Sequence, residues 1–446
     1  MPVPNIDPTR PIASASLLIS LTFAKAGVLT SQLEQRDDLI HEESRRVLRR
    51  ITLSRVSPFA DGAPLDLAPR LNLLTGDNGV GKTFLLDLIW TTLSQTWPKL
   101  ESWFDAESYE VGQYPKILVE GHRAENNVEY EIEIAYSFRA QRWNVGDQSG
   151  SEVAGPSNWS GPALYFGAQG DCRLWDPARD PRTLRPGREG DDYFFHFTPE
   201  NLENGLTSEQ GNVVCEGLIR DLVNWQRSGS PAFHQLQAML RELSDGTEVL
   251  VLGPPTKVSL EDVRDHPTLK LPYGLVPYTN LSAGMKRIVS VAYMLVWAWQ
   301  EHLRACKLRQ LNPTNQMVIL FDELETHLHP RWQRLILPAV FRAIDGLTEK
   351  QSEVQLFATT HTPIIPASVE TEVEPGRDRL LHFDLDEDGL VRVEEIAWAK
   401  FGDAAGWLTS PAFNLEQGGY SVEAERAMKA ADDLMANLRR DLPPAS

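Results

Sequence analysis

Residues 76–83 (GDNGVGKT) constrain the fold of this chain more than any other feature, because they match the pattern GxxxxGK[ST] without a mismatch. The apolar residues 70–75 before them read as a buried strand, and residues 83–97 after them read as a helix. Glycines let a backbone wrap round a phosphate, and the amides of the loop and of the helix N-terminus then face the anion. The sequence therefore predicts a phosphate-binding loop between a strand and a helix, within an α/β fold.

Each residue of this loop is a candidate contact for the phosphates of a nucleotide, and so is the residue that follows the loop. These candidates are Gly76, Asp77, Asn78, Gly79, Val80, Gly81, Lys82, Thr83 and Phe84. In loops of this kind the lysine reaches the β- and γ-phosphates, and the hydroxyl binds Mg²⁺. We therefore expect ATP and Mg²⁺ as cofactors, with Lys82 in a catalytic role and Thr83 as a metal ligand.

A second signal is the apolar run 317–321 (MVILF), which Asp322 and Glu323 follow directly. The carboxyl end of a buried parallel strand is the usual position of ligand-binding groups in α/β folds. There we expect Asp322 to hold Mg²⁺, directly or through water, and Glu323 to polarise the attacking water as a general base. Such a run before two acidic residues is common by itself, but together with the loop at 76–83 it indicates nucleotide hydrolysis.

Residues 281–286 (LSAGMK) resemble the LSGGQ-like signature of ATP-binding-cassette (ABC) ATPases, including their SMC, RecF and OLD branches. The resemblance implies that Ser282 and Gly284 cap the γ-phosphate of a nucleotide held by another subunit, and therefore a homodimer or higher oligomer with composite ATP sites. A hydroxyl and free amides at the start of a long helix, predicted over residues 284–308, suit an anion. The same pattern also serves as an ordinary helix N-cap.

Two further segments carry the resemblance. His361, within residues 359–363 (TTHTP), is similar to the switch histidine that contacts the γ-phosphate in this family, so we count it as a candidate catalytic residue. Residues 322–330 (DELETHLHP) resemble a variant found in OLD-type and Septu-type (PtuA-like) ATPases, in which residues 325–329 occupy the place of the D-loop at the dimer interface. The two histidines of this segment have no third ligand at a suitable spacing, so we expect no zinc site.

The resemblance covers roughly residues 46–100 and 275–385, and it implies an ABC-ATPase-like core with a mixed sheet and a helical or irregular insertion. Ser282 and Asp322 are 40 residues apart, which is longer than in transporter cassettes, and the best candidate for a Q-loop residue is Gln169. We expect an N-terminal appendage, an N-terminal ATPase lobe with a β-rich subdomain, an inserted lobe, a C-terminal ATPase lobe and a docking segment. These are residues 1–45, 46–170, 171–274, 275–400 and 401–446.

Within these divisions, residues 171–210 read as an irregular surface because they are rich in Asp, Pro, Arg and Gly. Residues 212–244 read as helical, and residues 421–440 carry one apolar stripe at helical spacing. That stripe either packs on the chain's own core or docks a partner.

The chain is acidic, with 62 Asp and Glu against 43 Lys and Arg and a net charge of −19. Phosphate contacts need clustered cations, so binding of nucleic acid would require a local basic patch. Three cysteines without CxxC spacing indicate buried thiols, and the apolar stretch 12–24 is too short to span a bilayer. We expect a cytoplasmic protein that does not contact membranes.

The reading that these features favour is an ATPase that dimerises around ATP and regulates a separate effector. The OLD and Septu resemblance implies that the effector is a nuclease in anti-phage defence. A RecF-like ATPase that acts on DNA in repair is the alternative, although the negative charge disfavours it. The long signature-to-Asp322 spacing disfavours a transporter subunit, and the presence of Glu323 disfavours a scaffold that does not hydrolyse its nucleotide.

Overall fold

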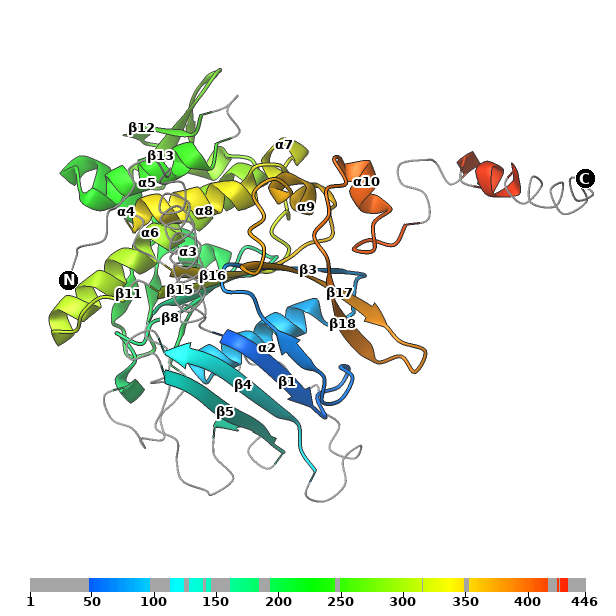
Figure 1. The fold of residues 1–446 in the computed structure, drawn as a ribbon. Coiled ribbons are helices and arrows are strands. Elements are labelled where there is room, and N and C mark those ends of the chain that lie inside the picture. Colours follow the sequence, from blue (N-terminus) through cyan, green and yellow to red (C-terminus); the bar gives the residue numbers. More distant parts are fainter. Residues whose placement is uncertain are drawn as a thin grey trace, which may run out of the picture.

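The computed structural model describes residues 48–96, 113–123, 128–138, 142–145, 161–183, 193–244, 249–314, 316–348, 353–415, 423–424 and 426–431. An eight-stranded sheet forms its centre (Figure 1). The strands of this sheet are β3 (Leu71–Gly76), β7 (Ala163–Phe166), β8 (Cys172–Trp175), β9 (Phe195–Phe197), β15 (Gln316–Phe321), β16 (Glu353–Thr359), β17 (Asp378–Leu385) and β18 (Val391–Ile396). Their order is β18-β17-β3-β16-β15-β7-β8-β9, parallel from β17 to β7 and antiparallel at both edges, so the predicted mixed sheet is confirmed.

A second, antiparallel sheet lies on one side of the central sheet, with helix α2 (Lys82–Ser94) between the two (Figure 1). Its strands, in the order β2-β1-β4-β5-β6, are β2 (Pro64–Asp66), β1 (Leu48–Ser54), β4 (Lys116–Arg123), β5 (Val128–Ser137) and β6 (Arg142–Val145). Because both sides of α2 are covered, nearly all of its residues are buried. This explains why the helix is apolar all round rather than amphipathic.

Helices cover the opposite face of the central sheet (Figure 1). They are α3 (Pro199–Asn204), α4 (Leu218–Ser228), α5 (Pro231–Glu242), α6 (Ala283–Arg309), α7 (Pro330–Gln333), α8 (Ile336–Leu347), α9 (Ile364–Val369) and α10 (Ala404–Leu408). The longest of them, α6, begins where the Ser282 hydroxyl accepts a hydrogen bond from the Met285 amide at 3.3 Å. The long apolar helix predicted over residues 284–308 is therefore present.

Alternate side chains of the central strands enter two separate cores. In β15, Met317 and Ile319 pack with the helices around α6, whereas Val318 and Leu320 pack with α2 and the antiparallel sheet. All four side chains are fully buried. A strand covered on both faces needs an unbroken apolar run, and this is the reason that MVILF is recognisable in the sequence.

Two expectations about the inserted segment were wrong in detail. Residues 171–210 are not simply irregular, because β8 and β9 extend the central sheet from within them. The helical stretch 212–244 is two helices, because Gly229 adopts a left-handed conformation (φ 59°) and ends α4 before Ser230 caps α5. Two small sheets complete the insertion: β10 (Leu206–Thr207) with β11 (Val213–Cys215), and β12 (Val251–Thr256) with β13 (His266–Leu271) and β14 (Gly274–Pro277).

A buried polar cluster joins the segment after β8 to the distal half of α6. The His302 ring lies 3.0 Å from an Asp176 oxygen, and the Trp175 indole donates to Asp180 at 2.9 Å. Cys306, one turn further along α6, contacts His302 at 3.5 Å, and all these side chains are nearly inaccessible. Because these side chains are inaccessible to solvent, we assign the cluster a structural role: its hydrogen bonds hold α6 against the central sheet.

The three cysteines are buried and unpaired, as predicted. None of the helices that the structure describes combines the length and the apolar composition needed to cross a bilayer. The predicted appendage 1–45 and most of the predicted helix 421–440 lie outside the described residues.

Candidate functional site

The glycine-rich loop connects β3 to α2, as its sequence predicts. Gly76 has a φ of 130°, and a Cβ atom there would lie 2.3 Å from the Phe383 carbonyl oxygen. Gly79 and Gly81 also have positive φ, 80° and 86°, and Gly79 has open space around it. The backbone conformation therefore requires glycine at these positions, and the resulting loop is a nest of amides at the start of a helix.

The other loop residues divide into an exposed and a buried set. Asp77 and Asn78 are exposed. Val80 and Phe84 are buried in the core that contains α2, so only their backbone amides can face a phosphate.

Lys82 lies folded over the loop that it belongs to. Its Nζ donates hydrogen bonds to the carbonyl oxygens of Gly76 at 2.8 Å and Asp77 at 2.6 Å, and only 5% of the residue is exposed. Burial lowers the pKa of Lys82 to about 8, while the charge of Asp322 opposes that shift. The carbonyl groups thus hold the Lys82 ammonium at the loop. A phosphate bound in the loop would give this ammonium a negatively charged partner as well.

Thr83 and Asp322 meet at the ends of α2 and β15. The Thr83 hydroxyl lies 3.0 and 3.1 Å from the two Asp322 oxygens, and Thr359 donates to the same carboxylate at 2.9 Å. Burial raises the pKa of Asp322, while hydrogen bonds from Thr359 and Thr83 oppose the rise. The Thr83 hydroxyl and the Asp322 carboxylate both offer oxygen atoms, the ligands that Mg²⁺ prefers. The two residues are therefore suited to hold Mg²⁺ beside the loop.

Glu323 and His361 follow the neighbouring strands β15 and β16. Glu323 has a φ of 49°, a conformation that bulky residues seldom adopt, and its amide donates to the Thr359 hydroxyl at 2.7 Å. One Glu323 oxygen lies 3.9 Å from Nε2 of His361, and the other accepts a hydrogen bond from Thr326 at 2.9 Å. Burial lowers the pKa of His361, and the charge of Lys82 adds to the effect. The two side chains therefore flank one partly open space next to Lys82.

The signature residues lie against the segment that follows β15. A Cβ on Gly284 would stand 2.7 Å from the His327 carbonyl oxygen, so this buried glycine allows a close approach of α6 to the segment. Ser282 is exposed, and in the described part of the chain its hydroxyl bonds to the Met285 amide alone. One chain thus brings Lys82, Asp322, Glu323 and His361 together, while it presents Ser282 to the outside.

Gln169, the candidate Q-loop residue, is exposed in the turn between β7 and β8. The turn begins beside the site, because the Phe166 carbonyl accepts a hydrogen bond from the Asp322 amide at 2.9 Å. Gln169 therefore lies in a turn at the same edge of the sheet as Asp322.

Three further residues take part in the site. Thr359 links Asp322 to the Glu323 backbone, and an oxygen of Glu325 accepts a hydrogen bond from the His361 amide at 2.6 Å. Arg287 on α6 is 8% exposed, and one of its terminal nitrogens is buried without a hydrogen-bond partner among the described residues. Glu325 belongs to the segment 325–329 expected at the D-loop position, whereas the sequence gives no signal for Thr359, which acquires its position only through contacts between distant segments.

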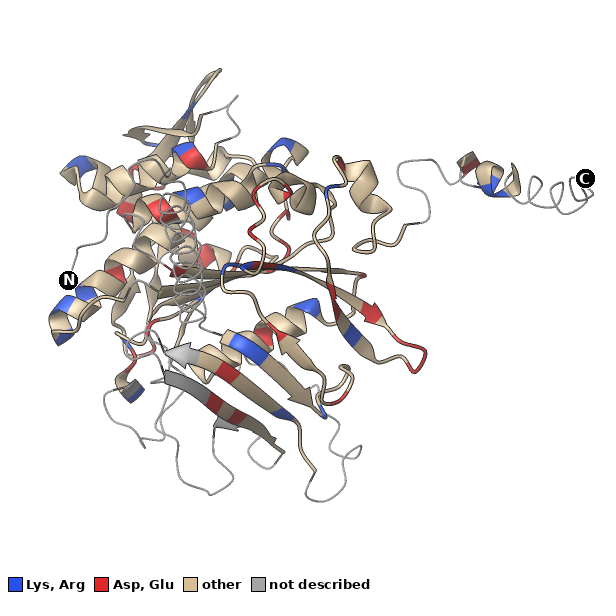
Figure 2. Cartoon of the chain, in the orientation of Figure 1, with Lys and Arg blue, Asp and Glu red and all other residues tan. Residues whose placement is uncertain are grey.

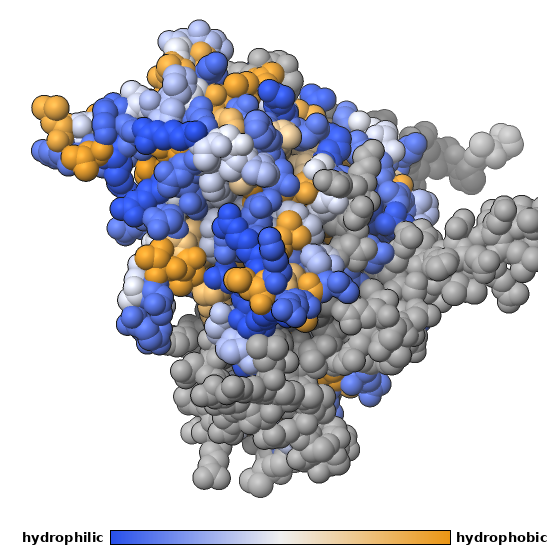
Figure 3. Space-filling model, turned by 90° about the vertical axis from the view of Figure 1, so that its left-hand side faces the viewer, coloured by the Kyte–Doolittle hydropathy of each residue, from blue (hydrophilic) through white to orange (hydrophobic). Residues whose placement is uncertain are grey.

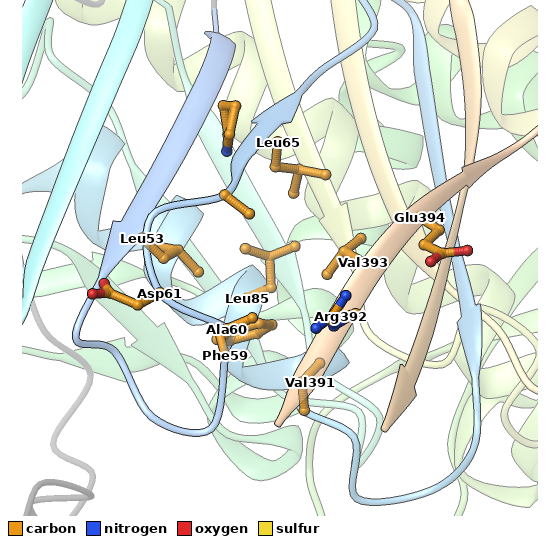
Figure 4. Close-up of a pocket in the computed structure, with 12 residues that line it drawn as sticks. Leu53, Phe59, Ala60, Asp61, Leu65, Leu85, Val391, Arg392, Val393 and Glu394 are labelled. Carbon is orange, nitrogen blue, oxygen red and sulfur yellow. The ribbon is translucent and has the colours of Figure 1, made fainter. Parts of the chain in front are cut away.

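A cavity of about 360 Å³ lies close to the loop (Figure 4). Apolar side chains from β1, α2 and β18, among them Leu53, Leu85 and Val393, form much of its wall, together with Phe59 from the β1–β2 connection. The Phe59 ring stacks on Phe84 and would contact a Cβ placed on Gly81. Phe59 therefore stands between the cavity and the loop.

Among the residues that the structure describes, no three His, Cys, Asp or Glu side chains form a metal-binding group of their own. A divalent cation at Thr83 and Asp322 would therefore need oxygen ligands from a bound phosphate or from water, which is the usual arrangement for Mg²⁺.

Residues 219–366 match the family described as "AAA domain, putative AbiEii toxin, Type IV TA system". The match covers about a third of the chain, including Ser282, Asp322, Glu323 and His361, and begins after the glycine-rich loop.

Several solved structures are similar in fold. The SMC head domain from Thermotoga maritima is 11% identical, with 79% of this chain and 99% of that chain covered at a TM-score of 0.39. An SMC head bound to the C-winged helix domain of ScpA is 13% identical, with 79% and 98% covered at a TM-score of 0.41. The recombination mediator protein RecF-ATPrS is 12% identical, with 80% and 99% covered at a TM-score of 0.37.

Proposed function

We propose that this chain, which has the fold and the motifs of ABC/SMC/RecF-like P-loop ATPases, binds and hydrolyses ATP. One observation carries the proposal: Thr83 contacts Asp322 at the mouth of the loop, with Glu323 beside Asp322 at the end of β15 and His361 after the neighbouring strand β16. Residues from three separate segments meet there, and each has the chemistry that phosphoryl transfer to water requires.

The proposed roles follow from the contacts. The amides of the loop and Lys82 hold the β- and γ-phosphates, and Thr83 and Asp322 hold Mg²⁺, which neutralises charge on the phosphates when it is bound. Glu323 accepts the proton of the attacking water, since its side chain is partly exposed and lies 3.9 Å from the His361 ring, the shortest ion pair that it makes with a described residue. His361 is placed to donate a hydrogen bond to the γ-phosphate.

We further propose that two chains assemble head to tail, so that Ser282 of one chain completes the site of the other. The support is that Ser282 and Ala283, at the start of α6, are exposed, whereas Lys82 and Asp322 are buried in the same chain. An exposed hydroxyl at the N-terminus of a 27-residue helix is a suitable anion ligand for a second molecule.

A mixing experiment tests the composite site. We expect Lys82→Ala chains and Ser282→Arg chains to be inactive separately, because each homodimer has two defective sites. Heterodimers combine both lesions in one site and leave the other site intact, so mixing should restore up to about half of the wild-type rate per heterodimer if sites act independently. Phosphate release by the purified mixture measures this.

The control is a mixture of Lys82→Ala with Glu323→Gln chains, whose lesions lie in the same half of the site and leave both sites defective. Recovery in neither mixture, although heterodimers are present by native mass spectrometry, would contradict the head-to-tail arrangement.

We propose, on the OLD and Septu resemblance, that the assembled ATPase acts in the cytosol and controls a separate effector, a nuclease of anti-phage defence. Lys and Arg are interspersed with Asp and Glu over the elements drawn in Figure 2, which favours a protein partner over a nucleic acid. The inserted lobe 171–274 exposes the large apolar side chains of Leu260, Val263 and Tyr273. The face shown in Figure 3 carries apolar residues in small groups among hydrophilic ones.

The C-terminal segment is the second candidate for effector docking. Trp407 in α10 is fully buried and donates to Glu370 at 2.8 Å, so residues 401–415 belong with the core. We therefore place the proposed docking element beyond residue 415.

Truncation after residue 415 is expected to preserve folding and ATP binding and to abolish co-purification with the co-expressed product of the adjacent gene. Truncation after residue 400 is the matched comparison, because it also removes Trp407 from the core and should give insoluble protein. If the chain ending at residue 415 still retains the effector, docking occurs elsewhere, and the exposed apolar residues of the inserted lobe become the site to mutate.

A further inference from the structure

Glu325 ties together the two loops that carry the proposed catalytic residues. One of its oxygens accepts a hydrogen bond from the His361 amide at 2.6 Å, across 36 residues of sequence. The same loops are joined at their base by the Leu324 amide, which donates to the Thr359 carbonyl at 3.2 Å. The backbone of His361 therefore takes its position from a side chain on the loop of Glu323.

The second oxygen of Glu325 is buried. The Thr360 hydroxyl interacts with the same carboxyl group and also lies 3.4 Å from the Thr362 carbonyl. The Glu325 side chain is therefore fixed between the two loops rather than turned toward solvent.

Burial is the main cause that raises the pKa of Glu325, and the neighbouring charge of Glu323 adds to the rise, while hydrogen bonds from the His361 amide and the Thr360 side chain oppose it. Lys82 at the start of α2 also interacts electrostatically with Glu325.

We propose that Glu325 is the positioning residue that holds His361 in place for the γ-phosphate. This role rests on the hydrolytic function proposed above. A carboxyl oxygen of Glu325 fixes the His361 amide and with it the start of the loop that carries the His361 ring. Glu325 acts through the loop that it holds and takes no part in proton transfer from the attacking water.

Two substitutions test whether the accepting oxygen of Glu325 matters. Glu325→Gln keeps an accepting oxygen, so it should retain kcat and KM within about twofold. Glu325→Ala leaves the His361 amide without its acceptor, so kcat should fall about tenfold or more while KM changes little. Glu387→Ala, an exposed carboxylate in the β17–β18 hairpin, is the control.

Hydrogen exchange of nucleotide-free protein gives a readout that does not depend on ATP hydrolysis. The His361 amide, in a peptide spanning residues 359–364, should exchange about tenfold faster in Glu325→Ala than in the wild type and normally in Glu325→Gln. Unchanged exchange in Glu325→Ala would overturn the positioning role. A Glu325→Gln chain as impaired as Glu325→Ala would show that the accepting oxygen is not what places His361, and it would also overturn the role. If the wild type failed to hydrolyse ATP, the proposed function would be wrong, and the exchange data would still decide whether Glu325 holds the loop.

Discussion

Replacing Glu323 by glutamine is expected to slow ATP hydrolysis by roughly 10²- to 10⁴-fold, the usual contribution of a general base. Glutamine has almost the same shape and can still accept a hydrogen bond from Thr326, as Glu323 does at 2.9 Å. It cannot accept the proton of the attacking water. Lys82, Thr83 and Asp322 remain in place, so ATP and Mg²⁺ should bind with nearly unchanged affinity. Single-turnover phosphate release and titration with a fluorescent ATP analogue measure the two effects separately.

Asp322→Asn gives the contrasting result that makes this test specific. This substitution removes a negative charge from Asp322, which contacts Thr83 at the proposed Mg²⁺ site and lies near Lys82. It should therefore weaken ATP binding in the presence of Mg²⁺ as well as ATP turnover. Glu387→Gln, on an exposed hairpin, should change neither quantity. A Glu323→Gln chain that hydrolyses ATP at the wild-type rate would show that Glu323 is not the base.

The loop and the strand before Asp322 could be predicted because their signals are local. Gly76, Gly79 and Gly81 are required by the backbone of one continuous turn, and the sequence of that turn is enough to identify it. The apolar run of β15 is continuous because both faces of the strand are buried. In each case neighbouring residues carry the whole signal, and no knowledge of distant contacts is needed.

The residues that were not predicted depend on contacts between distant segments. Strands β8 and β9 are three or four residues long and belong to the central sheet only through pairing with β7 and with each other. Thr359 is placed by contact with Asp322, 37 residues away in the sequence. Arg287 is a single charged residue in the sequence, yet it is 8% exposed in the structure and interacts electrostatically with Asp171 and Asp322. Periodicity and motif spacing contain no information about such pairings.

Replacing Lys82 by alanine is expected to reduce ATP affinity by about 100-fold or more, because a charged group that binds phosphate oxygens is worth about 3 kcal/mol. The loop would also lose the two contacts that Lys82 makes with its own carbonyl groups, so the amides would be less well ordered for the phosphates. Lys270→Ala, an exposed lysine on β13, is the control and should bind ATP normally. Wild-type affinity in Lys82→Ala would mean that the loop does not hold the phosphates.

Because the pKa of Lys82 is lowered, the interaction of Lys82 with the phosphates of ATP should depend on pH. A phosphate binds the charged form of the lysine, and burial reduces the pKa of the free site to about 8. Below that pH the lysine is charged and affinity is at its maximum; above it, each binding event must first protonate the lysine. Between pH 7 and pH 9 the charged fraction falls by about tenfold, and ATP affinity should fall by the same factor.

Lys82→Arg stays charged over this range, so whatever affinity it retains should not show this decline. Calorimetric titrations in buffers of different ionisation enthalpy would also show proton uptake on binding near pH 8 in the wild type, and a wild-type affinity that is flat from pH 7 to pH 9 would mean that Lys82 is charged throughout.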